Sequence, residues 1–284
     1  MELPRLMGVV NVTPDSFSDG GRFLEADAAV THGLSLVAAG ADLLDVGGES
    51  TRPGAAPVDE PEELRRVLPV VGRLAVDAGV PVSIDTSKAS VAAAALAAGA
   101  AIVNDVTAAG DDEMFGVVAT AGAGLVLMHM QGEPRTMQQD PRYDDVVVEV
   151  GDFLVDRLGA ARAAGVPTES LCADPGLGFG KTAAHNIELL ARLGELVARL
   201  DVPVLVGPSR KSFIARVLGD DLGTDLGRDP LARDDGTLAT AVWAVDHGAR
   251  IVRVHDAGAA ADALGLLAVM ESIDAASVGM GAVA

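Results

Sequence analysis

Eight short apolar runs, each ending at a small group of polar residues, constrain the fold of this chain more than any other feature. The runs cover residues 6–10, 42–46, 80–84, 101–103, 125–128, 171–173, 203–206 and 250–254. Each run is too short for a helix and shows no alternation of apolar and polar residues, which is typical of a strand buried on both faces. The segments between the runs are rich in Ala and Leu. Eight alternations of strand and helix predict an α/β fold, a single (β/α)8 TIM barrel with its active site at the C-terminal ends of the strands.

One domain accounts for the whole length of the chain. Its 284 residues fit one barrel of ordinary size, and no linker or change of composition marks a second domain. The expected helices cover residues 26–39, 60–78, 88–98, 111–121, 143–164, 186–199, 209–218 and 236–247. We therefore expect a single domain over residues 1–284, with a tail that frays from residue 273.

Charge and cysteine content exclude several classes of partner and site. The net charge is −20, whereas nonspecific binding to nucleic acid needs clustered Lys and Arg, and an anionic membrane surface would also repel an acidic protein. No apolar run approaches the roughly 20 residues of a membrane span. The single cysteine, Cys172, excludes an intrachain disulfide, and the chain enters its first strand too early for a signal peptide. These features predict a cytoplasmic protein that binds neither nucleic acid nor membranes.

Carboxylates, an amide and an ammonium group follow the apolar runs. They belong to Asp85, Asn104, Asp174 and Lys211. A buried carboxylate is costly unless it meets donors, and a flat heterocycle with an N–H and NH₂ edge offers a pair of them. Together these residues would read the edges of a pterin-like or purine-like ring. The alternative for each aspartate is a helix cap, and the sequence around Asp85 reads as one, whereas the glycines after Asp174 suit close approach of the backbone to a ligand.

Cationic groups gather after the last two runs. Residues 209–212 begin a helix, and Arg253 and His255 end the eighth run. The loops after strands 7 and 8 commonly bind phosphate in barrels, and an arginine grips phosphate through two N–H groups. Asn11 ends the first run, which neighbours the eighth in a closed barrel, and its carbonyl oxygen together with phosphate oxygens suits Mg²⁺. A surface ion pair is the alternative for an isolated Arg or His.

At these residues the chain resembles the dihydropteroate synthase family of pterin-binding barrels. The matching stretches are residues 7–21, 45–54, 83–86, 103–105, 128–132, 174–181, 207–212 and 253–256, which cover all eight strand ends. The resemblance implies a transferase that joins 7,8-dihydropterin-6-ylmethyl diphosphate to 4-aminobenzoate and releases 7,8-dihydropteroate and pyrophosphate. It also implies a homodimer, small-molecule substrates and a target of sulfonamides, which mimic aminobenzoate.

The resemblance further implies a role for individual residues. Asp85, Asn104, Met128, Asp174 and Lys211 would bind the pterin; Asn11, Arg52, Arg253 and His255 the diphosphate; and Phe17, Thr51, Pro53, Phe179 and Ser212 the aminobenzoate. Asp19, Arg52, Asp85, Lys211, Arg253 and His255 would be the catalytic set. The implied cofactor is Mg²⁺, bound to the protein through Asn11.

Two other functions are compatible with parts of this pattern. A methyltetrahydrofolate-binding methyltransferase barrel would share the pterin-reading acids but should lack the diphosphate clamp of Arg253, His255 and Lys211. A non-catalytic pterin-binding paralogue should have altered loop residues around Asp19 and Arg52, whereas both are present.

Overall fold

A computed structural model describes residues 4–13, 22–51, 54–219 and 230–281 of the chain. It contains an eight-stranded parallel sheet in the order β6-β5-β4-β3-β2-β1-β8-β7. The strands are β1 (Arg5–Asn11), β2 (Leu43–Gly47), β3 (Val82–Asp85), β4 (Ile102–Asp105), β5 (Gly124–Met128), β6 (Leu171–Asp174), β7 (Leu205–Val206) and β8 (Ile251–Val254). A bridge between Ala173 and Val204 joins β6 to the start of β7 and closes the barrel. The predicted (β/α)8 barrel is therefore confirmed.

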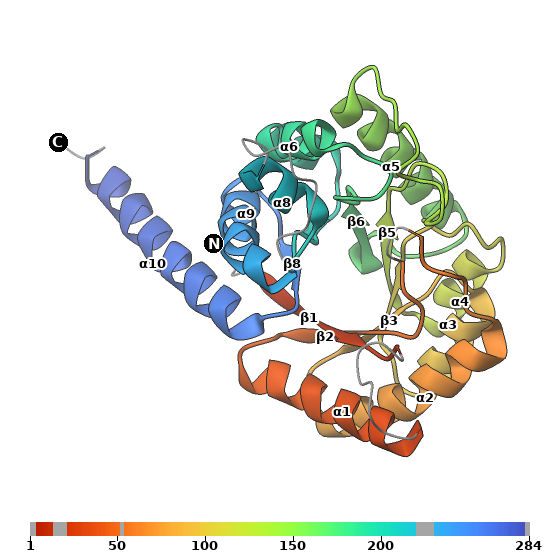
Figure 1. Cartoon of the computed structure of the whole chain (residues 1–284). Helices are drawn as coiled ribbons and strands as arrows, with labels where there is room; N and C mark the ends of the chain where they lie inside the picture. Colours follow the sequence, from red (N-terminus) through yellow and green to blue (C-terminus); the bar gives the residue numbers. More distant parts are fainter. Residues whose placement is uncertain (1–3, 14–21, 52–53, 220–229, 282–284) are drawn as a thin grey trace.

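Helices surround the strands on the outside of the barrel (Figure 1). They are α1 (Arg22–Ala38), α2 (Glu60–Asp77), α3 (Ala89–Ala97), α4 (Met114–Ala121), α5 (Val146–Ala163), α6 (Ala183–Ala191), α7 (Leu193–Arg199), α8 (Ser212–Gly219), α9 (Asp234–Asp246) and α10 (Ala257–Gly281), with short 3₁₀ turns η2 (Thr168–Ser170) and η4 (Pro230–Arg233). Side chains fix several helix starts: Asp59 accepts a hydrogen bond from the Glu62 N–H before α2, and Asp145 accepts from the Val147 and Val148 N–H groups before α5.

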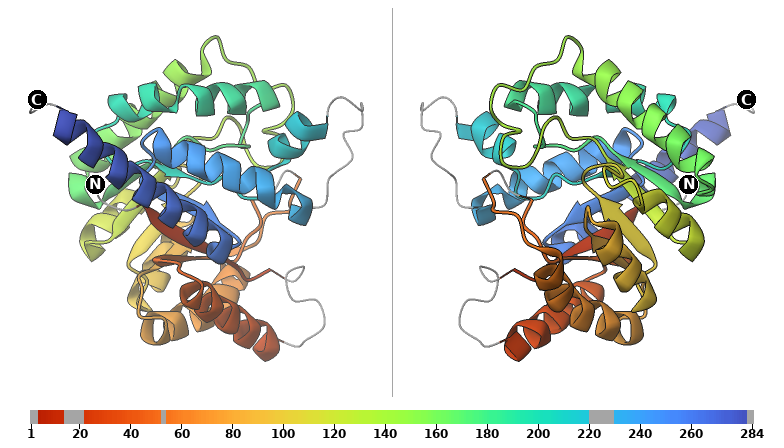
Figure 2. Two further views of the ribbon diagram at one scale, coloured as in Figure 1. Left: turned by 90° about the vertical axis from the view of Figure 1, so that its left-hand side faces the viewer. Right: turned by 90° about the vertical axis from the view of Figure 1, so that its right-hand side faces the viewer.

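Two helical predictions differ from the structure. The expected helix 186–199 is two helices, α6 and α7, because the backbone departs from helical geometry at Arg192, with φ −107° and ψ 20°. No helix is predicted after β8, and the chain is predicted to fray from residue 273, whereas α10 continues to Gly281. This helix projects from the barrel toward the C-terminus (Figure 2). Its many alanines give it high helix propensity without the apolar periodicity on which the prediction relied.

The inward face of the strands changes from apolar to polar toward their C-terminal ends. Met7, Leu43, Val126, Cys172 and Leu205 form an apolar cluster of their own, with Ile102 and Ile251 packed against it. Side chains two residues apart on a strand lie on the same face. The next inward positions on five of these strands are therefore Asp45, Asn104, Met128, Asp174 and Arg253. The apolar cluster therefore lies deeper in the barrel, and these five inward side chains form a second layer at its C-terminal end, called the polar layer below.

The connection after β6 packs directly on the end of β5, and Gly176 permits this close approach. Gly176 has φ +67°, and a Cβ at this position would lie 1.9 Å from the carbonyl oxygen of His129. Neither the conformation nor the contact tolerates a side chain.

Gly176→Ala should therefore lower the free energy of unfolding by about 2–4 kcal/mol, because the connection must move away from β5. Urea denaturation measures the change. Gly159→Ala in α5 is the matched control, because a Cβ there meets nothing within 4 Å. Equal stability of the two variants would contradict the prediction.

Candidate active site

Arg253 is held by two carboxylates inside the mouth of the barrel. Its Nε donates to Asp45 Oδ2 at 2.6 Å, and its Nη2 donates to Asp85 Oδ2 at 2.8 Å. The Nδ2 of Asn104 donates to the same oxygen of Asp45 at 2.9 Å. Side chains from β2, β3, β4 and β8 therefore meet in one network, which rules out a surface ion pair as the role of Arg253.

Asp45 is the central member of this network, although it is not among the site residues predicted from the sequence. It lies within an apolar run and is fully buried, with no hydrogen-bond partner for Oδ1. Ser83, its neighbour in the register of β2 and β3, also has a buried and unpartnered hydroxyl. Unsatisfied buried polar atoms are rare and costly, and they gather where a protein handles a ligand. The available signal was a charged residue at an inward strand position, two residues before the strand end.

Neither predicted aspartate caps a helix. The N-cap of α3 is Lys88, which makes no side-chain capping bond, whereas Asp85 binds Arg253. Thr182 caps α6, and Asp174 Oδ1 instead accepts a hydrogen bond from the Gly176 N–H at 2.7 Å. Each carboxylate therefore has one oxygen held within the protein at the strand ends, and neither is used to begin a helix.

Burial changes the proton affinity of both carboxylates. Burial raises the pKa of Asp85 to about 7; Arg253 opposes this shift, and the nearby acids Asp45, Asp105 and Glu63 add to it. Burial also raises the pKa of Asp174, against the effects of the Gly176 N–H, Lys211 and Arg253. Perturbed acids in a recess of this kind are typical of binding and catalytic sites.

Lys211 completes the polar layer from the β7 side. Its Nζ lies 4.0 Å from the centre of the Phe179 ring, a cation–π contact. Loss of surrounding water lowers the pKa of Lys211 to about 8, while Asp174 raises it. Met128 packs in the same apolar cluster as Phe179. The structure therefore brings together the predicted pterin residues and one predicted aminobenzoate residue.

The remaining predicted residues lie at the same end of the barrel where the structure describes them. The His255 N–H donates to Ser209 Oγ at 3.2 Å, and its ring Nδ1 lies 2.9 Å from that oxygen. Asn11 ends β1, Thr51 follows β2 in the β2–α2 connection, and Ser212 begins α8. Four further predictions fall outside the described residues, namely Phe17, Asp19, Arg52 and Pro53.

A buried lysine fixes the glycine-rich β6–α6 connection. The Nζ of Lys181 donates to the carbonyl oxygens of Gly176 at 3.1 Å and Phe179 at 3.0 Å, and it lies 2.8 Å from His129 Nδ1. Burial, together with Lys181, lowers the pKa of His129 to about 3, so this imidazole is a neutral acceptor. Sequence reasoning placed Lys181 within a motif but gave it no role; its function is to hold Phe179 and the Asp174 connection in place.

The described residues contain no group of three or more His, Cys, Asp or Glu side chains that could hold a metal ion. The side chain predicted to bind a cation is that of Asn11, which offers one neutral amide oxygen. Such a donor fits Mg²⁺ that keeps its other ligands from water and a substrate diphosphate.

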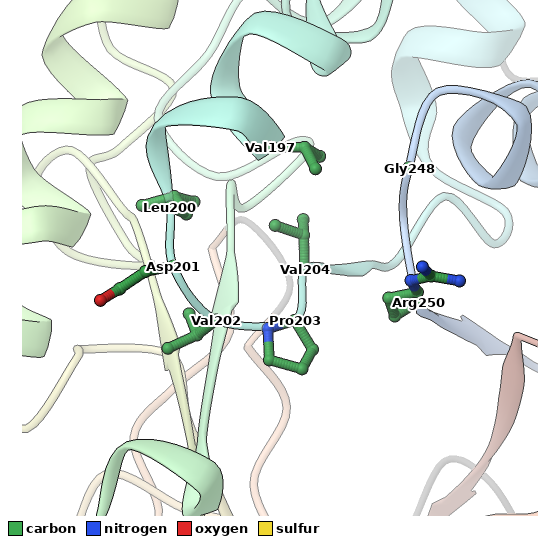
Figure 3. A pocket seen from close by; sticks show the side chains of 8 residues that line it. All are labelled: Val197, Leu200, Asp201, Val202, Pro203, Val204, Gly248 and Arg250. Carbon is green, nitrogen blue, oxygen red and sulfur yellow. The ribbon is translucent and has the colours of Figure 1, made fainter. Parts of the chain in front are cut away.

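A separate pocket of about 260 Å³ lies at the opposite end of the barrel (Figure 3). Its lining includes Val204 and Arg250, which directly precede β7 and β8. This position is remote from the polar layer at the C-terminal strand ends.

Within the described parts of the chain, no helix combines the length and apolar character required to cross a membrane.

Comparison with known proteins agrees with this geometry. Residues 7–255 match the pterin binding enzyme family. The dihydropteroate synthase of Escherichia coli K12 is 47% identical over 253 residues, covering 89% of this chain and 86% of the relative. The solved structure of Xanthomonas albilineans dihydropteroate synthase with 4-aminobenzoic acid has a TM-score of 0.87 at 48% identity, covering 95% of this chain and 94% of that one. A further structure of the same enzyme, in complex with 7,8-dihydropteroate, has a TM-score of 0.84 at 46% identity and the same two coverages. The chain therefore belongs to the pterin binding enzyme family and is a member of its dihydropteroate synthase group.

Proposed function

We propose that the chain condenses 7,8-dihydropterin-6-ylmethyl diphosphate with 4-aminobenzoate to give 7,8-dihydropteroate and pyrophosphate. The observation that carries this proposal is the meeting of Asp85, Asn104, Asp174 and Lys211 with Arg253 in one barrel mouth. It favours a synthase over a methyltransferase barrel, because a diphosphate leaving group needs the cation that Arg253 supplies beside the ring-binding acids.

The hydrogen-bonding groups of the polar layer suit the edge of a pterin ring. The carboxylates of Asp85 and Asp174 would accept hydrogen bonds from the N–H and NH₂ groups of the ring, and the Lys211 ammonium group would donate to a ring acceptor. Asp174 Oδ1 already accepts from Gly176, which fixes the orientation of the carboxylate. Met128 and Phe179 would pack against the apolar ring faces.

The reaction breaks a carbon–oxygen bond and expels pyrophosphate. Arg253 and His255 would stabilise the negative charge that develops on the leaving oxygens. The carbon left behind is cation-like and conjugated with the dihydropterin, and the acids around it would favour that charge. The nitrogen of aminobenzoate then attacks this carbon and loses a proton, so no protein nucleophile is required. Mg²⁺ bound through Asn11 would further neutralise the diphosphate.

We also propose a homodimer and a cytoplasmic location. Exposed apolar side chains gather on neighbouring elements at one side of the barrel, namely Ile187 on α6, Val217 and Leu218 on α8, Leu231 in η4 and Trp243 on α9. Apolar surface of this kind is typical of an interface between subunits. The free and buried thiol of Cys172 is consistent with a reducing compartment.

Pyrophosphate release tests the function directly. The purified chain should release pyrophosphate and form dihydropteroate only when both substrates and Mg²⁺ are present.

Arg253→Ala should lower kcat/KM by about 10²–10³-fold, because the charge on the leaving group loses its partner. Unchanged activity accompanied by a lower melting temperature would instead assign Arg253 a structural role.

Asp174→Asn should weaken pterin binding by about 100-fold, because an amide brings an N–H group toward the donors of the ring. Isothermal titration with 6-hydroxymethyl-7,8-dihydropterin measures this loss. Asp152→Asn, on the exposed surface of α5, is the control and should bind as the unmodified chain does. Retained tight binding by Asp174→Asn would remove this residue from the pocket.

The pH profile of kcat/KM for the pterin substrate should be bell-shaped. The rate constant should rise as Asp85 loses its proton near pH 7 and fall as Lys211 loses its proton near pH 8. Lys211→Arg keeps the positive charge above pH 8 and should remove the alkaline decline. A decline that persists in Lys211→Arg would assign it to another group.

A further inference from the structure

The base of the β2–α2 connection is tied to α2 by one ammonium group. The Nζ of Lys88 donates to Glu49 Oε2 and to Glu63 Oε2, each at 2.5 Å. Glu49 lies in the β2–α2 connection, Glu63 lies in the first turn of α2, and Lys88 directly precedes α3. A single side chain therefore joins three separate segments at the C-terminal end of the barrel.

Further contacts hold the same base against α2. The Arg66 Nη1 donates to the Gly48 carbonyl oxygen at 2.8 Å. A Cβ at Gly48 would lie 2.7 Å from Val67 Cγ1, so the backbone there packs directly on the helix. Thr51 follows two residues after Glu49. The fixed base therefore determines the direction in which the chain enters the segment that carries Thr51.

The burial of charged groups in this arrangement costs free energy, which indicates that the arrangement fixes the position of the connection. Glu63 is fully buried, and its Oε1 has no hydrogen-bond partner. Burial lowers the pKa of Lys88, but the hydrogen bonds that its ammonium group donates to Glu49 and Glu63 outweigh this effect, so the net shift of the pKa is upward and the ammonium form persists. A buried ion pair adds little net stability relative to a well-packed apolar group of similar volume. A gain in stability therefore does not explain why Lys88, Glu49 and Glu63 are arranged with one oxygen left without a hydrogen bond.

We propose that Lys88 is a positioning residue for the second substrate, 4-aminobenzoate. This inference rests on the proposed function. The pterin-binding side chains Asp85, Asn104 and Asp174 lie on the strands themselves, where the barrel fixes them. Thr51 lies on the connection that Lys88 holds through Glu49. Loss of the contacts of Lys88 with Glu49 and Glu63 should therefore weaken the binding of aminobenzoate and leave the binding of the pterin unchanged.

The test compares three variants with the unmodified chain. Lys88→Met should raise KM for aminobenzoate by about tenfold, as expected when binding groups are misplaced by a fraction of an ångström to an ångström. Glu49→Leu should reproduce this rise, because it removes the acceptor on the β2–α2 connection and leaves the buried Glu63 paired with Lys88. Lys88→Arg should restore most of the affinity. Binding of 6-hydroxymethyl-7,8-dihydropterin should stay within about twofold in all three.

Arg73→Met is the matched control, since it removes a cation of α2 that pairs with Asp27 on the exposed surface, away from the β2–α2 connection. Direct titration of 4-aminobenzoate into protein saturated with 6-hydroxymethyl-7,8-dihydropterin and pyrophosphate reads the effect without turnover. Failure of the unmodified chain to make dihydropteroate would thus overturn the proposed function alone. An unchanged affinity for aminobenzoate in Lys88→Met, or an equal loss for both substrates with a lower melting temperature, would overturn the positioning role.

Discussion

The contact of Arg253 with Asp45 and Asp85 is the interaction on which the barrel mouth depends. Three charged groups share a recess above an apolar cluster, and each would be costly there alone. Loss of one partner from such a buried set typically costs about 3–5 kcal/mol. Because Asn104 also donates to Asp45, this arginine indirectly orients the Asn104 amide. One guanidinium group therefore links β2, β3 and β8 at the mouth of the barrel.

Packing and polar chemistry are divided along β2, β4, β6 and β8. The inward residues near the start of the strands pack as an apolar cluster, and those two positions later carry acids, an amide and a cation. The polar layer retains imperfections that an optimised core would not, including the unpartnered oxygens of Asp45 and Ser83. Natural proteins accept such local costs at functional sites.

The three lysines of the chain all serve the C-terminal end of the barrel. Lys211 faces Asp174 and Phe179 within the site, Lys181 holds the β6–α6 connection, and Lys88 holds the base of the β2–α2 connection. In a strongly acidic protein, these cations are placed where connections leave the strands. In the function proposed above, the strand ends would bind the pterin, and the connections fixed by these lysines would bind the second substrate.

The sequence by itself determined the eight strands, the barrel and the grouping of Asp85, Asn104, Asp174, Lys211 and Arg253 at one rim. It could do so because buried parallel strands have a local apolar signature and their C-terminal ends must meet. Only the tertiary structure decided that Asp45 is the partner of Arg253, that Lys181 pins a connection, and that Lys88 bridges Glu49 to Glu63. These contacts join residues from separate strands and connections. Their distances and burial depend on how the barrel closes, which no local pattern of residues encodes.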